Sequence, residues 1–298
     1  MKNTIKPICF SSAVLISGFL AIASSCGGEQ TTGKEGPAMK EEQKVVKVIH
    51  DIPYRDGESE SWRLDLAAPE NFGEEIRPAI VIIHGGGWRA GSKQNMVYRN
   101  LLIHYAFQGY VTLSVEYRFD QEAAFPACVE DVKCAVRWLR AHAGQYSVDP
   151  DRIGAYGHSA GAHLALMLAM CPPSAGLEGD GGWDEYSSMV NAVAGGSTPT
   201  QIGARHSDWG KPEWWPIGYI SEDVPPMLLI HGVDDPIVKV ELVDDFVEKL
   251  KAAGARDLTY IREEGAHHGI AYDQKLDITQ PAMDAFFART LRPGGEQE

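Results

Sequence analysis

The sequence predicts one α/β domain built on an eight-stranded, mostly parallel sheet with helices on both faces. Short apolar runs of buried-strand length alternate with helical stretches from residue 79 onward, which is typical of βαβ units. Two earlier β-patterned runs flank a turn and indicate an antiparallel hairpin at the sheet edge. The chain has 298 residues, enough for one large core, and we expect a single catalytic domain over residues 45–292.

Residues 1–26 have the pattern of an export signal. Lys2 and Lys6 form a basic start, an apolar stretch follows from Ile8 to Ala23, and small residues precede Cys26. The pattern resembles a bacterial lipoprotein signal peptide, in which the cysteine becomes the lipidated first residue. An ordinary cleaved signal peptide and an uncleaved anchor are the alternatives. We therefore expect an exported protein, located in the cell envelope (periplasm or outer membrane) or secreted.

The segment between this signal and the domain is expected to be a tether. Residues 27–44 are rich in Gly, Thr, Glu and Lys and hold almost no apolar side chains, so they cannot bury enough surface to become ordered. Residues 293–298 are expected to be a disordered tail of the same kind.

The predicted elements follow in order along the domain. The first two strands form the edge hairpin, and right-handed crossovers between the later parallel strands place helices on both faces. The strands are expected at Val45–Ile52, Trp62–Ala67, Ala79–Ile83, Val111–Glu116, Ile153–Tyr156, Val190–Ala194, Met227–His231 and Leu258–Arg262. The helices are expected at Lys93–Gln108, Ala127–Ala143, Ala160–Met170, Val238–Ala253 and Asp277–Thr290.

Charge and cysteine content narrow the function classes. The formal charge is −14 and no long Lys/Arg run is present, which argues against nucleic acid and against electrostatic adhesion to anionic lipid. Membrane contact is expected only through a lipid anchor at Cys26.

The 5 Cys show no metal-ligand spacing, so we expect neither a metal nor a cofactor. Cys128 and Cys134 lie on one predicted helix and cannot bridge each other, whereas Cys171 could reach either, although buried free thiols are the commoner case.

A Gly-x-Ser-x-Gly sequence stands where a predicted strand turns into a helix. In Gly157-His-Ser-Ala-Gly161 the two glycines let strand and helix backbones approach closely, and Ser159 is held in a strained turn above the sheet edge. The N–H of Ala160 begins the helix without an intrahelical partner, so it can donate to a developing oxyanion. The sequence therefore predicts a nucleophile elbow centred on Ser159.

A glycine run follows the strand predicted at Ala79–Ile83. In His84-Gly-Gly-Gly-Trp88, consecutive N–H groups can turn toward one point without side-chain obstruction. We expect Gly86 and Gly87 to complete an oxyanion hole, with a flexible turn as the alternative.

The nucleophile needs a base and a carboxylate. A hydroxyl is weakly nucleophilic near neutral pH, so Ser159 requires a histidine within hydrogen-bond reach and an acid that fixes the imidazole tautomer. Asp234 and Asp235 follow one late strand and His267 and His268 follow the next. The spacing alone does not show which aspartate and which histidine act with Ser159.

These motifs resemble those of the α/β-hydrolase fold, esterase/lipase type, over residues 45–292. His84–Trp88 and Gly157–Gly161 are similar to bacterial carboxylesterases near the hormone-sensitive-lipase-like and feruloyl-esterase-like groups, and Gly157–Leu164 also resembles arylformamidases. The resemblance implies the chain order Ser, Asp, His for the catalytic groups.

The resemblance also selects one residue from each open pair. The pattern His-Gly-x-x-Asp-x-x-Val falls on His231, Gly232, Asp235 and Val238 and implies Asp235 as the acid. The pattern Gly-x-x-His-Gly falls on Gly265, His268 and Gly269 and implies His268 as the base.

The other histidines near these motifs have structural interpretations. We expect His84 to brace the glycine loop through hydrogen bonds and His163 to be a satisfied packing residue. His158 and His231 stand beside functional positions but cannot turn back toward them.

Aromatic residues gather in the irregular stretch 172–225 and beside the glycine run. Aromatic walls suit aryl or sugar groups, and we expect Trp88, Trp214 and Trp215 to contact substrate. The alternative is that these rings only pack the loop onto the sheet.

Together these features predict a metal-free serine carboxylic-ester hydrolase that acts through an acyl-enzyme. The expected substrates are small or aryl acyl esters, such as acetyl or feruloyl groups on carbohydrates. An arylformamidase or amidase with the same triad is the enzymatic alternative. A hydrolase fold retained as a binding module is the non-enzymatic one.

Overall fold

The computed structural model describes residues 13–14, 45–70, 75–201 and 210–292. The predicted export signal other than Ala13–Val14, the cysteine at position 26, the predicted tether and the predicted tail lie outside the described residues.

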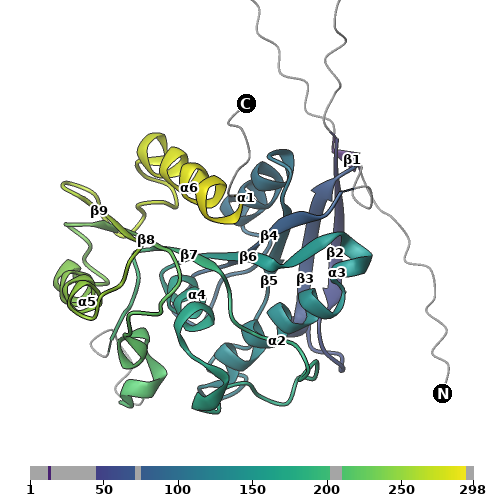
Figure 1. The fold of residues 1–298 in the computed structure, drawn as a ribbon, viewed down its shortest axis with the longest axis horizontal. Coiled ribbons are helices and arrows are strands. Elements are labelled where there is room, and N and C mark those ends of the chain that lie inside the picture. The colour runs from purple at the N-terminus through teal and green to yellow at the C-terminus, as the bar shows by residue number, and fades with distance from the viewer. Residues whose placement is uncertain (1–12, 15–44, 71–74, 202–209, 293–298) are drawn as a thin grey trace, which may run out of the picture.

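The core of the protein is one twisted sheet (Figure 1). Its strands are β1 (Ala13–Val14), β2 (Val46–Pro53), β3 (Arg63–Pro69), β4 (Arg77–Ile83), β5 (Val111–Val115), β6 (Val148–His158), β7 (Ala192–Gly196), β8 (Met227–Gly232) and β9 (Leu258–Glu263). They lie in the order β1-β2-β3-β5-β4-β6-β7-β8-β9. Pairing is antiparallel from β1 through β3 to β5 and parallel from β5 to β9.

Helices cover both faces of this sheet (Figure 1). The α-helices are α1 (Met96–Phe107), α2 (Ala127–Ala141), α3 (Ala143–Tyr146), α4 (Ala160–Met170), α5 (Val240–Ala252) and α6 (Leu276–Leu291). Short 3₁₀ helices occur at Glu60–Trp62, Pro173–Ala175, Pro212–Trp214 and Pro216–Tyr219. Among the described helices, none is long and apolar enough to span a membrane.

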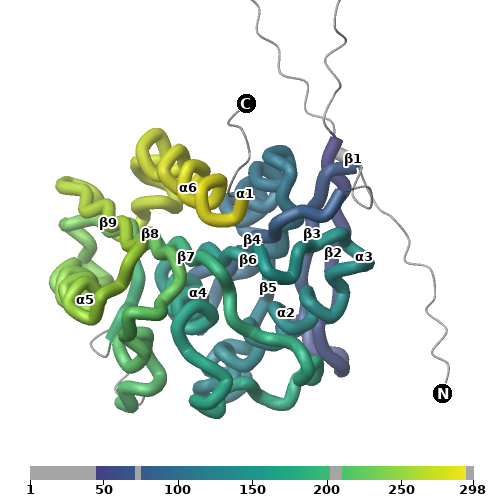
Figure 2. Tube along the Cα trace, in the orientation of Figure 1, coloured from purple at the N-terminus to yellow at the C-terminus, as the bar shows by residue number. Residues whose placement is uncertain are grey.

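Each face has its own hydrophobic core. Side chains of α2, α4 and α5 pack on one face and those of α1 and α6 on the other, because strands buried on both sides present apolar residues to both layers. Figure 2 shows α6, the last helix, lying beside α1, the first. His104 of α1 contacts Asp284 of α6 across 2.9 Å, so the C-terminal helix closes the layer that the first helix opens.

The eight predicted strands are present as β2–β9, so the predicted fold class is confirmed. The additional strand, β1, is two residues long and pairs with β2 from within the predicted export signal. Two residues are too few to carry a detectable alternation pattern, which is why the sequence did not indicate this strand.

Several predicted boundaries differ from the structure, among them the following three. Helix α1 begins at Met96 instead of Lys93, because Lys93 is buried and its ammonium group bonds Asp65 at 2.6 Å. The helix predicted at 127–143 ends at Ala141, where His142 bonds the carbonyl of Trp138 and a separate turn follows. Strand β6 begins at Val148, five residues before the prediction.

The three cysteines of the described domain are free thiols. Cys128, Cys134 and Cys171 are buried and unpaired with one another, as expected for structural cysteines. Burial raises the pKa of Cys134 to about 11, which keeps this thiol protonated and unreactive near neutral pH.

Candidate active site

Ser159 lies at the sharp turn between β6 and α4. Its backbone has φ 55° and ψ −122°, a region that L-residues rarely adopt and that costs on the order of 1–3 kcal/mol. A Cβ at Gly161 would stand 2.1 Å from the carbonyl oxygen of Ile83, and one at Gly157 would stand 2.1 Å from the carbonyl oxygen of Gly161. Both positions therefore require glycine, because a side chain would push the helix off the strand ends.

His268 and Asp235 complete a continuous hydrogen-bonded chain with this serine. The Nε2 atom of His268 lies 2.9 Å from Ser159 Oγ, and its Nδ1 atom lies 2.8 Å from Asp235 Oδ2. The loop after β8 carries Asp235 and the loop after β9 carries His268. Three strand ends thus bring together residues separated by up to 109 positions in the sequence.

The carboxylate of Asp235 is buried and fixed by its own loop. The N–H groups of Ile237 and Val238 donate to its Oδ1 atom at 2.8 and 3.0 Å, which leaves Oδ2 for His268. Burial acts to raise the pKa of Asp235, but the bonds from His268 and the two N–H groups outweigh it and hold the pKa below its ordinary value. The group is therefore ionised when the imidazole requires a counter-charge.

The neighbours of these two residues point elsewhere. Asp234 is exposed, and its carbonyl oxygen lies 3.0 Å from Nδ1 of the exposed His267. The structure thus places Asp235 and His268 beside Ser159 and leaves Asp234 and His267 outside this hydrogen-bonded chain.

The glycine loop lies against the nucleophile. A Cβ at Gly85 would stand 3.4 Å from the Cβ of Ser159, which measures how closely the two segments approach. Gly86 and Gly87 have φ values of 130° and 62°, conformations that favour glycine. Backbone conformations of this kind let the N–H groups of a glycine loop turn toward one point. With Ala160 at the first turn of α4, these are the N–H groups that the sequence predicts for the oxyanion hole.

Two tyrosines fix the start of this loop. The hydroxyl of Tyr117 donates to the carbonyl of His84 at 3.0 Å, and the hydroxyl of Tyr98 accepts from the N–H of Gly85 at 2.7 Å. Neither tyrosine belongs to a short motif. Only their buried position beside β4 and β5 links them to the site, so sequence reasoning did not identify them.

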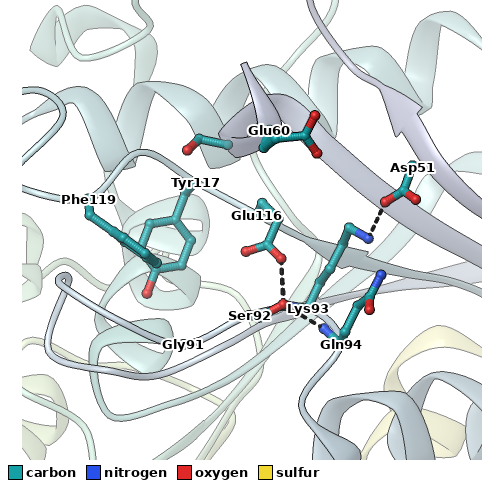
Figure 3. A pocket seen from close by; sticks show the side chains of 10 residues that line it. Asp51, Glu60, Gly91, Ser92, Lys93, Gln94, Glu116, Tyr117 and Phe119 are labelled. Carbon is teal, nitrogen blue, oxygen red and sulfur yellow. Dashed lines mark hydrogen bonds and ion pairs between the residues drawn. The ribbon is translucent and has the colours of Figure 1, made fainter. Parts of the chain in front are cut away.

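Glu116 braces the same loop from a small polar pocket. Its Oε2 atom lies 3.0 Å from His84 Nε2, and its Oε1 atom accepts from Ser92 at 2.8 Å. Figure 3 shows the Glu116–Ser92 bond and the adjacent Lys93–Asp51 pair in this pocket of about 260 Å³. Burial acts to raise the pKa of Glu116, but the bonds from His84 and Ser92 prevail and hold it below its ordinary value.

His84 and His163 have the structural roles that the sequence indicates. His84 is fully buried, with Nδ1 at 2.9 Å from the carbonyl of Gly85. His163 is also buried, and its two ring nitrogens face the indole N–H of Trp88 and the carbonyl of Trp214. Burial lowers the pKa of His163 to about 4, so it is neutral near pH 7.

The tryptophans near the site are mostly packing residues, contrary to expectation. Trp88 is 3 % exposed and Trp215 is 0 % exposed, and the two rings meet edge to face at 6.0 Å. Trp214 alone of the three is partly exposed, with its ring 4.7 Å from that of Phe125. The expectation that Trp88 and Trp215 contact substrate therefore does not match their burial. An aromatic-rich loop has the same composition whether its rings line a pocket or fill the core beneath it.

No cluster of three or more His, Cys, Asp or Glu side chains within residues 45–70, 75–201 and 210–292 could hold a metal ion. The polar groups around Ser159 instead form the directed chain of donors and acceptors that nucleophilic catalysis uses.

The protein has an α/β-hydrolase fold. Three features define it: the strand order, the strained elbow, and the order Ser159, Asp235, His268 along the chain. Within this class the chain belongs to the BD-FAE family, whose family model matches residues 64–212. The match includes the glycine loop and the elbow.

The chain is also similar to curated esterases. Esterase LipC of Mycobacterium tuberculosis is 30% identical over 72% of this chain and 58% of its own length. The chain spans about half the length of the first curated relatives it matches (58%, 56% and 47% of theirs).

Three solved structures, of two proteins, superpose over most of the domain. A truncated carbohydrate esterase from gut microbiota is 25% identical with a TM-score of 0.70, covering 82% of this chain and 96% of that one. Thermogutta terrifontis esterase 2 phosphorylated by paraoxon is 30% identical with a TM-score of 0.71, covering 83% and 96%. The same esterase with butyrate bound has a TM-score of 0.68 at 30% identity, covering 78% and 92%.

Proposed function

We propose that the protein is a serine carboxylic-ester hydrolase that works through an acyl-enzyme. The observation that carries this proposal is the chain Ser159–His268–Asp235, with bonds of 2.9 and 2.8 Å, beside a glycine loop in close contact with the serine. Named esterases among the relatives of similar fold support the same reaction class.

The geometry assigns a role to each group. Ser159 Oγ attacks the ester carbonyl while His268 Nε2 takes its proton, and Asp235 stabilises the imidazolium through Nδ1. The N–H groups of the glycine loop and of the first turn of α4 hold the oxyanion, each contributing about 3–4 kcal/mol by comparison with oxyanion-hole deletions. His268 then protonates the leaving alcohol, and water releases the acid in a second, equivalent cycle.

The test is hydrolysis of a chromogenic acetyl ester by the wild type and by Ser159→Ala. The variant should lose at least about 10⁴-fold in kcat, because the attacking atom is removed. Its melting temperature should stay close to that of the wild type, since Ser159 stands at a turn with its side chain outside the packed core. Near-normal hydrolysis by a folded Ser159→Ala protein would reject the proposal.

For the substrate we propose small or aryl acyl esters, such as acetyl or feruloyl groups on carbohydrate. The similarity to a gut carbohydrate esterase and to an esterase with bound butyrate supports a short acyl group and a sugar alcohol. The partly exposed Trp214, packed against Phe125, offers an aromatic surface at the loops.

An arylformamidase is the competing reaction, favoured by the sequence from Gly157 to Leu164. A panel of acetyl, butyryl, feruloyl and long-chain esters beside an N-formyl aromatic amine separates the two. We expect kcat/KM to be highest for a short or feruloyl ester. A tenfold preference for the formamide, about 1.4 kcal/mol of transition-state stabilisation, would replace the esterase assignment.

We also propose that Cys26 carries lipid and anchors the protein in the cell envelope. The basic, apolar and small-residue order of residues 1–26 supports this. Mass spectrometry of the mature N-terminus should find an acylated Cys26. Membrane partition should disappear in Cys26→Ser, because stable anchoring needs about two acyl chains. A mature chain with an unmodified first residue would reject the lipid anchor and indicate simple secretion.

A further inference from the structure

Two side chains hold the backbone carbonyl of His268. The Nε2 atom of His158 lies 2.7 Å from this oxygen, and Ser197 Oγ donates to it at 2.9 Å. Both residues are buried, with exposures of 6 % and 0 %. The sequence predicts no catalytic role for His158, whose ring cannot turn back to Ser159, and Ser197 belongs to no short motif.

The two donors come from adjacent strand ends. His158 is the last residue of β6 and pairs with Gly196, the last residue of β7, and Ser197 follows directly. The N–H of Ser159 donates to the carbonyl of Gly196 at 2.8 Å. The nucleophile and both donors therefore stand at the ends of the same pair of hydrogen-bonded strands.

The histidine that they hold stands on a loop and not on a strand. His268 belongs to the loop after β9, the last strand of the sheet, and glycine follows it at position 269. Tyr156, two residues before His158 on β6, donates to the carbonyl of Ala271 at 2.6 Å and holds the same loop further on. These bonds add to the one between His268 Nδ1 and Asp235 Oδ2, and they tie the loop to the strands that precede and flank Ser159.

We propose that His158 and Ser197 are positioning residues that set the reach of His268 to Ser159 through its backbone carbonyl. This inference rests on the proposed serine-hydrolase function and extends it. Because a carbonyl oxygen only accepts, His158 must donate from Nε2 and carry no proton on Nδ1 when neutral. Burial, reinforced by the adjacent His268, lowers the pKa of His158 to about 4, which keeps this donor state over the range in which His268 must act as a base.

The test compares His158→Gln with His158→Met. These side chains have similar lengths and volumes, but only glutamine can donate a hydrogen bond from the place of Nε2. We expect His158→Gln to stay within about threefold of the wild-type kcat. His158→Met should lose about 10- to 100-fold, in the range expected when a reacting group shifts by about 1 Å. KM should change by less than about twofold in both, because His158 and Ser197 are buried beneath the site.

A second measurement separates positioning from folding. An organophosphate ester reacts covalently with active serines. The amplitude of the reaction gives the fraction of chains with an active serine, and its rate gives the reactivity of that serine. His158→Met should keep the wild-type amplitude and lose rate in parallel with kcat, and Ser197→Ala should show a smaller loss of rate. Equal rates for His158→Gln and His158→Met, or a loss confined to amplitude, would overturn the proposal. A wild type that reacts with neither ester nor organophosphate would instead reject the proposed function.

Discussion

Asp234 and Asp235 show how one residue's environment decides its role. The two side chains are adjacent in sequence, yet Asp235 is 3 % exposed and bonds His268 at 2.8 Å while Asp234 is exposed. The turn at Ile237 and Val238 supplies the N–H donors that keep Asp235 ionised. Function at this position depends on the backbone around the carboxylate as much as on the carboxylate itself.

Asp235→Asn should therefore be far more damaging than Asp234→Asn. The amide cannot stabilise the imidazolium and favours the wrong tautomer of His268, so kcat should fall by about 10⁴-fold. The exposed Asp234→Asn should stay within about twofold of the wild type, and steady-state hydrolysis of an acetyl ester measures both. Equal losses in the two variants would contradict the assignment of the acid.

At the scale of elements, the elbow depends on close approach between α4 and the strand ends. Gly161 packs where a Cβ would stand 2.1 Å from the carbonyl oxygen of Ile83, whereas a Cβ at Gly144 in α3 would meet no atom within 4 Å. Two helical glycines in one chain thus experience opposite constraints.

Gly161→Ala should destabilise the fold by about 1–3 kcal/mol and lower esterase activity, because the helix that carries the nucleophile must move. Gly144→Ala should be neutral or stabilising by up to about 1 kcal/mol, since alanine favours helix and meets no clash. Urea unfolding of both variants beside the wild type gives the two free energies. Similar values for both variants would mean that the elbow does not require the close approach.

Sequence patterns predicted the elements well where the signal is local. The eight main strands and the elbow follow from short runs and fixed spacings. The start of α1 did not, because Lys93 is drawn into an ion pair with Asp65, which lies 28 residues earlier. A contact between residues so far apart in the sequence cannot be predicted from the residues around a helix end.

In the site, too, short patterns predicted the motif residues but not the residues that support them. The family pattern selected Asp235 and His268, which the structure places in contact with each other. Glu116, Tyr98 and Ser197 support the site through contacts that join distant segments and belong to no short motif. Aromatic composition did not distinguish the buried Trp215 from a pocket residue.

At the scale of the whole molecule, buried histidines couple stability to pH. Burial lowers the pKa of both His158 and His163 from an ordinary value of 6.5 to about 4. Between these pH values the unfolded chain binds protons that the folded chain does not. The contribution of each histidine is therefore complete above about pH 6.5 and falls as the pH is lowered toward 4.

The free energy of unfolding should accordingly decline from pH 6.5 to 4.5, by at most about 1.4 kcal/mol per pH unit for each histidine. Urea denaturation at half-unit pH steps measures this slope. His163→Gln should reduce the slope by removing one of the two groups, whatever its effect on absolute stability. A free energy that is constant across this window would show that these rings are protonated in the folded protein.

The most direct test of the catalytic assignment is covalent labelling with paraoxon followed by intact-protein and peptide mass spectrometry. A related esterase of similar fold is phosphorylated by this compound. The wild type should gain one phosphoryl group per chain, located on Ser159, with hydrolysis lost in proportion. Ser159→Ala should gain none. A label on a different residue, or full labelling of Ser159→Ala, would contradict the assignment of Ser159 as the nucleophile.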